Sequence, residues 1–163
     1  MVDLDVAYVP TPKQVVRQML NLARLRRGET LYDLGAGDGR ILIEAAREYG
    51  AKPVGIEIDP ARVSRMKERL KATHVDAELI QGDFMEMDLS KADVVAIYLS
   101  SSVNARLSPK LRLELREGAR VVSLDYDLPG WTIEREIKVE SGGVKRTIYL
   151  YMVSKSWAGE LKR

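Results

Sequence analysis

A glycine-rich turn behind a carboxylate is the first stretch of this sequence that could do chemistry. Residues 33–39 read DLGAGDG, follow a short apolar run and lead into a helical pattern. Glycines at Gly35, Gly37 and Gly39 let the backbone turn tightly and approach a ligand where a β-carbon would block it. The turn therefore predicts a binding site at the end of its strand.

The glycine spacing and the acid in front of it separate two classes of cofactor. A dinucleotide site carries G-x-G-x-x-G facing a pyrophosphate, whereas this chain has G-x-G-x-G preceded by Asp33. A carboxylate there would repel a pyrophosphate, but it suits a ligand with an ammonium group. S-adenosylmethionine carries such an amine and a sulfonium, and it has no phosphate. The stretch favours this cofactor over NAD.

Acidic residues also close the next two apolar runs. Glu57 lies 18 residues after Gly39 (57 minus 39), the register at which an acid accepts both ribose hydroxyls of an adenosine-type cofactor, and Ile58 lies beside it. Asp83 could accept from an adenine amino group, and Phe84 could pack on the ring. Either acid alone could simply face water or close a turn. Three such features in order at successive strand ends favour an adenosine site.

These side chains meet only if their strands end at one edge of a sheet. Apolar runs alternate with helical patterns, which predicts right-handed βαβ units and a parallel sheet covered on both faces. The expected strands are 30–34, 53–58, 77–81, 93–99 and 120–124, and the expected helices are 11–28, 40–49, one that begins at Asp59-Pro60, and 108–118. Strands 131–140 and 145–154, joined by Ser141-Gly142-Gly143-Val144, predict a hairpin. The fold class is α/β: a Rossmann-like, doubly wound, mostly parallel sheet with a C-terminal antiparallel hairpin.

Composition narrows the possible activities. The chain has 163 residues, with 26 Lys and Arg against 24 Asp and Glu, and no Cys. Disulfides, thiolate zinc sites and cysteine nucleophiles are therefore excluded, and no metal site is expected. No apolar run approaches the roughly 20 residues of a membrane span, and the first residues lack a signal-peptide pattern. We expect one cytoplasmic domain over 1–163, whose segment 1–28 forms a loop and helix over the cofactor. Scarce Asn and Gln are typical of proteins selected at high temperature.

The motifs resemble those of the class I, seven-strand methyltransferases that use S-adenosylmethionine, over nearly the whole chain. More narrowly, the sequence is similar to the archaeal protein lysine methyltransferases, which are similar to the mitochondrial ATP-synthase c-subunit lysine methyltransferases. The matching stretches are Tyr8-Val9-Pro10-Thr11-Pro12, residues 32–40, Pro109-Lys110-Leu111, Gly130-Trp131 and Tyr149-Leu150-Tyr151. The resemblance implies the sheet order 3-2-1-4-5-7-6 with strand 7 antiparallel.

The same resemblance places the first of these stretches over the methionine half of the cofactor. Thr11 would lie near its carboxylate and Tyr8 near its sulfonium, where an aromatic ring beside a cation contributes roughly 0.5 to 2 kcal/mol. Thr11 could instead, or in addition, cap the first helix, and Tyr8 could pack on that helix as a hydrophobic staple.

The end of the fourth strand, residues 97–100, is expected to face the methyl acceptor, because the methyl group points there in this superfamily. It lacks the [Asn/Asp/Ser]-Pro-Pro-aromatic element of nucleobase amine methylation and the paired glutamates that hold a guanidinium, and pyrimidine C5 methylation needs a Cys. A lysine amine needs only alignment and loss of a proton, which costs about 4 to 5 kcal/mol at pH 7 from a pKa of about 10.4. A desolvated channel beside the sulfonium would lower that pKa, so no general base is required.

Tyr98 and Asn104 are the candidate catalytic residues, because a phenol oxygen and an amide oxygen could orient the amine at the channel lip. Tyr98 could equally pack in the core, and relatives in the resembled family carry Phe there, so its hydroxyl is not expected to be essential. Asn104 could merely satisfy loop backbone. We predict a monomeric methyltransferase of broad specificity for exposed protein lysines, requiring neither nucleic acid nor membrane. A methyltransferase acting on RNA or a small molecule, or a protein that binds the cofactor without turnover, remains an alternative.

Overall fold

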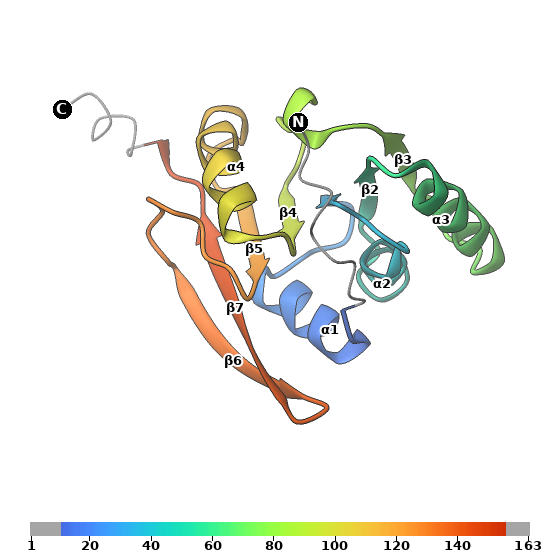
Figure 1. Ribbon diagram of the computed structural model, residues 1–163, viewed down its shortest axis with the longest axis horizontal. Coiled ribbons are helices and arrows are strands. Elements are labelled where there is room, and N and C mark those ends of the chain that lie inside the picture. The colour runs from blue at the N-terminus through green and yellow to red at the C-terminus, as the bar shows by residue number, and fades with distance from the viewer. Residues whose placement is uncertain (1–10, 156–163) are drawn as a thin grey trace.

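A single seven-stranded sheet organises the part of the chain that the computed structural model describes, residues 11–155 (Figure 1). The strand order is β3-β2-β1-β4-β5-β7-β6, which confirms the order that the resemblance implied. Tyr8 lies outside the described residues, so its contact with a sulfonium stays a prediction, as does the single-domain organisation over 1–163.

Five parallel strands bring the predicted binding residues to one edge. They are β1 (Thr30–Leu34), β2 (Lys52–Glu57), β3 (Glu78–Gln81), β4 (Val94–Ile97) and β5 (Arg120–Leu124). β1 pairs with β2 on one side and β4 on the other, so the chain reverses its direction of winding there. Ligands of doubly wound sheets bind outside the carboxyl ends of the strands at this point.

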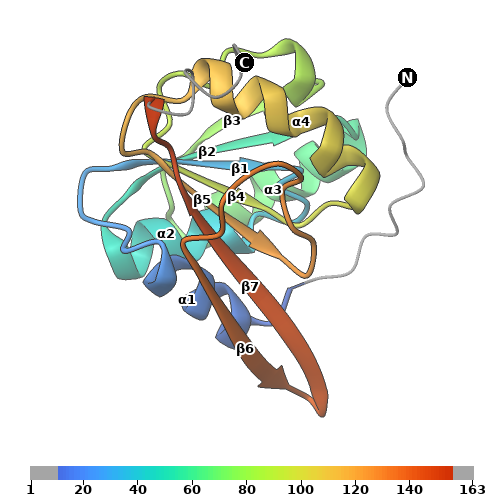
Figure 2. The same cartoon turned by 90° about the vertical axis from the view of Figure 1, so that its left-hand side faces the viewer.

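The helices cover both faces of the sheet (Figure 2). They are α1 (Lys13–Leu22), α2 (Arg40–Tyr49), α3 (Pro60–Ala72) and α4 (Ser101–Glu114), with a short 3-10 helix at Phe84–Glu86. Apolar side chains of α1 and α2 form one buried cluster with β4, β5 and β7, and Leu107 and Leu111 of α4 join the cluster on the opposite face. The two layers bury every residue of β4 and β5. No helix in the described part of the chain has the length and apolar character needed to cross a membrane.

The predicted hairpin forms one edge of the sheet. β6 (Arg135–Ser141) and β7 (Val144–Met152) are joined by two glycines with φ of 59° and 77°, the left-handed pair that a tight two-residue turn requires. β7 runs antiparallel to β5, and its last partner is Ile148, opposite Leu124. Residues 144–147 therefore extend beyond the carboxyl end of β5, on the edge that holds the predicted site (Figure 2).

Two helix boundaries differ from the prediction. α1 ends at Leu22 instead of near Gly28, because Ala23 caps it and Arg24 takes a positive φ of 52°. Pro12 occupies its N-cap without a side-chain hydrogen bond, so Thr11 does not cap this helix through its hydroxyl.

α4 begins at Ser101, not at Ser108-Pro109. Ser100 caps it by accepting from the Val103 amide at 3.3 Å, and Pro109 lies inside the helix. A Ser-Pro pair resembles a helix start because proline needs no hydrogen bond in the first turn. Here Ser100 provides the cap, and the helix tolerates the missing backbone N–H of Pro109.

Candidate active site

The glycine loop between β1 and α2 has the backbone that only glycine adopts without strain. Gly35, Gly37 and Gly39 have φ of 79°, 59° and 82°. A β-carbon on Gly39 would lie 2.9 Å from Met66 Cγ, so the loop also needs glycine for space against α3. The loop is anchored to β2 by the Gly35 amide, which donates to the Ile56 carbonyl at 2.8 Å.

Glu57 joins this loop to the end of β2. Its carboxylate is 3% exposed; Oε1 accepts from the Gly37 amide at 3.0 Å and Oε2 from the Asp59 amide at 3.1 Å. A carboxylate has about four acceptor positions, so two backbone bonds leave room for a pair of hydroxyls. Ile58 follows as a half-buried side chain. The arrangement fits the predicted ribose site, and it shows that Glu57 also holds the glycine loop.

Asp33 is a buried carboxylate that no cation neutralises in the described part of the chain. It is 4% exposed at the end of β1, and no hydrogen-bond donor or cation pairs with its side chain within residues 11–155. Burial, and then the charges of Glu57 and Asp38, raise the pKa of Asp33 to about 7. Burying an unpaired charge is costly, so the site is suited to a ligand that brings a cation.

A network of charged residues ties the start of α1 to the glycine loop. Asp38 pairs with Arg40 at 2.6 Å and with Arg69 at 2.7 Å, and Arg40 Nη1 donates to the Thr11 carbonyl at 2.8 Å. Burial opposes ionisation of Asp38, but hydrogen bonds and charge from Arg40, followed by Arg69, lower its pKa to about 2. Thr11 is buried and tied to the glycine loop through Arg40, and its position at the methionine carboxylate stays a prediction.

The end of β3 completes the predicted adenosine side. Gly82 donates to the Glu57 carbonyl at 3.0 Å, which brings the β3 end beside the β2 end. Asp83 caps the 3-10 helix by accepting from the Met85 amide at 2.9 Å through one of its two oxygens. Phe84 is half-buried and packs against the apolar cluster on the α4 face. Contacts of Asp83 and Phe84 with an adenine ring stay a prediction.

The two predicted catalytic residues lie at the end of β4 and in α4, but they differ in exposure. Tyr98 is partly exposed and packs near Tyr126, with ring centroids 6.4 Å apart. Asn104 is fully buried, and its Nδ2 donates to the carbonyls of Tyr126 and Asp127 at 3.2 and 3.0 Å. Asn104 thus holds the loop after β5 and does not lie at a lip, because α4 begins earlier than predicted and buries it.

Three further residues at this edge are absent from the sequence prediction. Asp125 and Tyr126 follow β5, and Arg146 comes from β7. The acid after the fifth strand could have been found from its position, as the acids at the other strand ends were. Arg146 could not, because the register of a hairpin against β5 is not readable from residue types alone.

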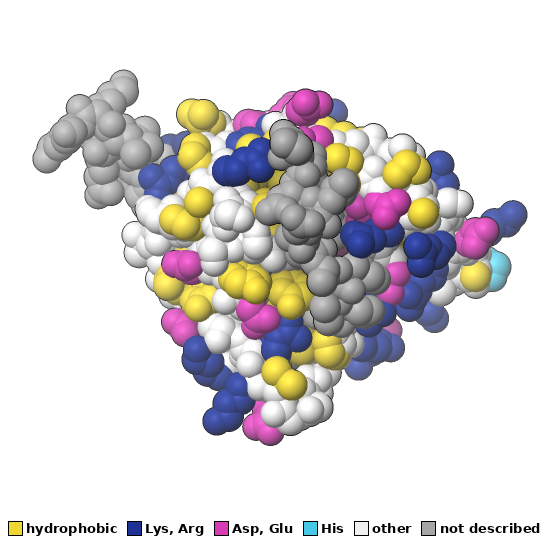
Figure 3. Space-filling model, in the orientation of Figure 1, with side chains coloured by type: hydrophobic (Ala, Val, Ile, Leu, Met, Phe, Trp, Pro, Cys, Tyr) yellow, Lys and Arg dark blue, Asp and Glu magenta, His cyan; other side chains and the backbone are white. Residues whose placement is uncertain are grey.

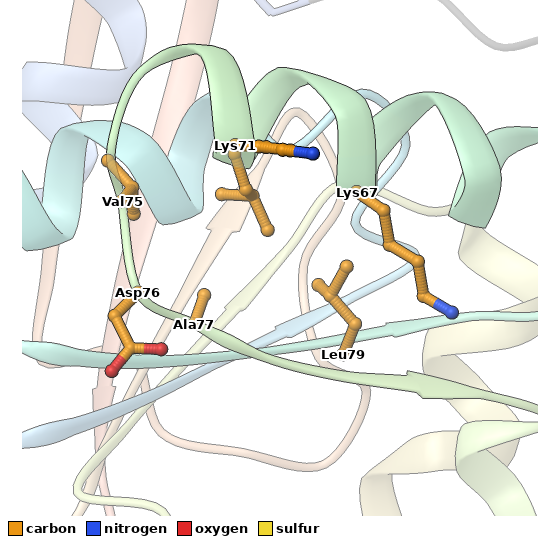
Figure 4. Close-up of a pocket in the computed structure, with 7 residues that line it drawn as sticks. Lys67, Lys71, Val75, Asp76, Ala77 and Leu79 are labelled. Atoms are coloured by element: carbon orange, nitrogen blue, oxygen red, sulfur yellow. The ribbon is translucent and has the colours of Figure 1, made fainter.

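A hollow elsewhere on the surface does not belong to this site. It measures about 370 Å³ and opens between the end of α3 and β3, where Leu70, Val75, Ala77 and Leu79 form an apolar floor under Lys67, Lys71 and Asp76 (Figure 4). None of the site residues described above contributes to its lining. No group of three or more His, Asp or Glu side chains suited to a metal ion occurs within residues 11–155.

The chain has extensive similarity to known methyltransferases. A protein-lysine N-methyltransferase of Saccharolobus islandicus is 43% identical over 151 residues, which cover 91% of this chain and 94% of that protein. The ATP synthase c-subunit lysine N-methyltransferase of Mus musculus is 35% identical over 77% of this chain, which spans only 51% of that protein. The crystal structure of a protein named RNA methyltransferase from Salinibacter ruber, in complex with S-adenosyl-L-homocysteine, is 46% identical with a TM-score of 0.84, over 90% of this chain and 95% of that chain.

Residues 33–135, which run from the carboxylate before the glycine loop to the start of β6, match the family described as the ANTKMT methyltransferase domain. The match includes the four strand ends that carry Asp33, Glu57, Asp83 and Tyr98. With this match and the level of identity to its relatives, the chain belongs to the ANTKMT methyltransferase domain family.

Proposed function

We propose that this protein transfers the methyl group of S-adenosylmethionine to the ε-amine of lysine residues in proteins. The observation that carries the cofactor is Asp33, a buried carboxylate beside a glycine loop, with no counter-charge among residues 11–155. The ammonium of the methionine moiety supplies the missing charge. The related structure from Salinibacter ruber, which holds the demethylated cofactor, supports the same assignment.

The cofactor lies across the carboxyl ends of β1, β2 and β3 in this proposal. Glu57 accepts from the ribose hydroxyls, Asp83 accepts from the adenine amino group, and Phe84 packs on the ring. Ile58 borders the ribose, and the backbone of the glycine loop approaches the cofactor closely. Thr11, held by Arg40, lies at the methionine carboxylate. Bound there, the cofactor supplies an electrophilic methyl group on a cationic sulfur.

The acceptor amine approaches from the ends of β4 and β5. Aromatic side chains there, Tyr98 and Tyr126, offer apolar surface for the alkyl chain of a lysine. The reaction forms a nitrogen–carbon bond, breaks the sulfur–methyl bond and releases one proton from nitrogen. Desolvation beside the sulfonium promotes loss of that proton, so positioning and exclusion of water are the main tasks of the protein.

Lysine as the acceptor rests on the curated relatives. The Saccharolobus islandicus protein, named a protein-lysine N-methyltransferase, matches this chain over 94% of its own length. The chain spans about half of the mouse relative, 51%. The ATP synthase c-subunit, for which the mouse enzyme is named, is therefore not inferred as a substrate of this chain. Protein substrates with accessible lysines are the shared chemistry.

RNA is the second candidate acceptor, and two observations favour it. The Salinibacter ruber relative, 46% identical, is named an RNA methyltransferase. α3 also carries several basic side chains, and dark blue side chains gather over this part of the molecule in Figure 3: Arg62, Arg65, Lys67, Arg69 and Lys71. Arg62 and Arg69 are paired with Asp59 and Asp38, whereas Arg65, Lys67 and Lys71 are exposed and attract phosphates.

One experiment separates the two acceptors. The protein is incubated with cofactor labelled in the methyl group and with extract of its source cells, and the products are digested with protease or with nuclease. Label released by protease, with a gain of one methylene mass on lysine, supports the proposal. Label released by nuclease transfers the function to RNA, and no label in any fraction despite tight cofactor binding indicates a non-catalytic binding protein.

We propose broad specificity, which the open surroundings of the acceptor edge support. Tyr126 is 37% exposed there, so lysines in extended, flexible segments can reach the site. A peptide array with varied neighbours of one lysine measures this directly, and methylation confined to a single context contradicts it. Cytoplasmic location and a monomeric state remain predictions, which cell fractionation and sedimentation test.

A further inference from the structure

An ion pair and two tyrosines from three strands meet beyond the carboxyl ends of β4 and β5. Arg146 Nε donates to Asp125 Oδ2 at 2.8 Å, and the guanidinium carbon lies 5.2 Å from the centre of the Tyr98 ring. The Tyr98 ring is within 18° of parallel to that of Tyr126. The hairpin overhang of β7 thus places a fixed cation on the aromatic surface proposed for the acceptor.

The backbone at Asp125 is strained. Asp125 has φ of 64°, and the Tyr126 amide donates to the Leu124 carbonyl at 2.8 Å, which together form a γ-turn with a left-handed centre. A γ-turn of this hand is rare. A residue other than glycine at positive φ costs about 1 to 3 kcal/mol, although Asp tolerates this region better than most residues. Strain of this kind is concentrated at functional sites.

Two elements hold the turn in place. The Asp125 amide donates to the Thr147 carbonyl at 2.7 Å, and Asp125 Oδ1 accepts from the Thr147 amide at 3.3 Å. On the other side, the side-chain nitrogen of Asn104 donates hydrogen bonds to the carbonyls of Tyr126 and Asp127, which follow the turn. Asn104 Oδ1 is buried without a hydrogen-bond partner among the described residues. An unpartnered buried atom is costly, so Asn104 supports the turn at the expense of one unsatisfied oxygen.

Both oxygens of the Asp125 carboxylate have partners. One oxygen faces the Thr147 amide and the other faces Arg146, whose Nη2 also lies 2.8 Å away. Because Arg146 compensates the charge of Asp125, the carboxylate attracts a second cation only weakly. If a neutral residue replaced Arg146, the Asp125 carboxylate and the face of the Tyr98 ring would lie together without a cation. Such an environment stabilises a cationic amine.

We propose that Arg146, held by Asp125, is a specificity-determining residue of the acceptor site that admits the lysine amine in its neutral form. Its guanidinium lies over the Tyr98 ring and neutralises the charge of Asp125. Neither group then remains to attract a protonated amine. The neutral amine keeps the apolar wall for its alkyl chain and its lone pair for the methyl group. This inference rests on the proposed lysine methyltransferase function.

The pH dependence of the reaction tests the proposal, because few other groups face Arg146. They are Asp125, Tyr98 and Tyr126 among residues 11–155. Burial raises the pKa of Tyr98 above its ordinary value, which favours the neutral phenol. The enzyme is assayed with S-adenosylmethionine and a single-lysine peptide that the unaltered protein methylates, across pH 6 to 10.

Opposite shifts are expected from the two members of the pair. Arg146→Gln frees Asp125, so the peptide KM falls while kcat at neutral pH drops about tenfold, and the rising limb of the pH profile moves alkaline by about one unit. Asp125→Asn leaves Arg146 without compensation, so the limb moves toward acid. Asn tolerates a positive φ, which preserves the turn. Arg146→Lys keeps the cation and retains the parental profile.

A less basic substrate separates this role from a purely structural one. In aminoethylcysteine the side-chain sulfur withdraws electrons and lowers the basicity of the amine, so a peptide with this lysine analogue restores the kcat of Arg146→Gln at neutral pH. Parental profiles in both variants, or a uniform loss of kcat that the analogue does not rescue, overturn the inference. If the unaltered protein methylates no protein or peptide at all, the proposed function fails instead.

Discussion

Replacing Asp33 by asparagine is expected to weaken cofactor binding and to stabilise the cofactor-free protein. The residue is 4% exposed, and burial raises the pKa of its carboxyl from 3.8 to about 7. Because the folded pKa lies above the unfolded one, this carboxyl contributes most to stability below pH 4, and the contribution is lost as the pH rises through 7. A difference of about three units corresponds to about 4 kcal/mol, since each unit is worth about 1.4 kcal/mol.

Asp33→Asn removes this penalty at alkaline pH. Part of this gain in the free energy of unfolding is lost again, because burying the asparagine amide without hydrogen-bond partners costs about 1 to 3 kcal/mol. We therefore expect the cofactor-free variant to be about 2 kcal/mol more stable than the parent at pH 8, and no more stable at pH 4. Urea unfolding at both pH values, monitored by circular dichroism, measures the difference.

Cofactor binding responds in the opposite direction. The ammonium of S-adenosylmethionine needs the ionised carboxylate, so below pH 7 the parent must lose a proton to bind, and its affinity falls about tenfold per pH unit. In the variant this pH dependence disappears, and affinity at pH 8 is weaker by about 1.5 to 3 kcal/mol, the range for hydrogen bonds to charged groups. Calorimetry in buffers of different ionisation enthalpy reports the proton directly. An affinity that is flat between pH 6 and 7 in the parent, together with a variant that gains no stability at pH 8, refutes the reasoning.

Three other changes test the cofactor side. Glu57→Gln weakens S-adenosylmethionine binding in calorimetry by about 1.5 to 3 kcal/mol while keeping one acceptor for the glycine loop; unchanged affinity would remove the ribose site from β2. Gly39→Ala lowers the melting temperature more than Gly118→Ala does, because both have φ near 82° but only Gly39 has Met66 Cγ at 2.9 Å from a new β-carbon; equal losses contradict the contact. Arg40→Gln destabilises the protein more at pH 7 than at pH 2, because the lowered pKa of Asp38, about 2, contributes stability that is lost as the pH falls through that value; urea unfolding at the two pH values checks this.

The positions of the proposed cofactor residues were predictable because each residue is adjacent in sequence to the strand that positions it. Asp33, Glu57 and Asp83 lie at or just beyond the ends of β1, β2 and β3, and the parallel pairing of these strands brings them to one edge without further information. The predicted strands 30–34 and 120–124 coincide with β1 and β5. The prediction 93–99 extends past β4 (Val94–Ile97), and the prediction 131–140 begins four residues before β6 (Arg135–Ser141). A local pattern is sufficient where the side chain and its strand are encoded together.

Helix starts were less predictable because two signals competed. Ser100 and Ser108 both precede helical stretches, and only the fold decides which one caps α4. The error had a functional consequence. With α4 beginning at Ser101, Asn104 lies in its first turn beneath the β5 loop, where its amide nitrogen serves carbonyl groups. A residue type suited to orienting an amine thus serves to support the turn that carries Asp125.

The acceptor half differs from the cofactor half in how its parts are encoded. Tyr98, Asp125 and Arg146 come from β4, the end of β5 and β7, and the last of these reaches the site only because β7 runs antiparallel and extends four residues past its pairing with β5. Its position depends on hairpin register, which a change in turn length would shift without affecting the glycine loop or Glu57. Relatives can therefore keep the cofactor half intact and alter the wall that meets the acceptor. Such a separation is compatible with one relative named for protein lysine at 43% identity and another named for RNA at 46%. The acceptor of this chain must accordingly be read from the residues around Tyr98, and the charge on Arg146 is the feature of that wall that most directly distinguishes a neutral amine from a cation.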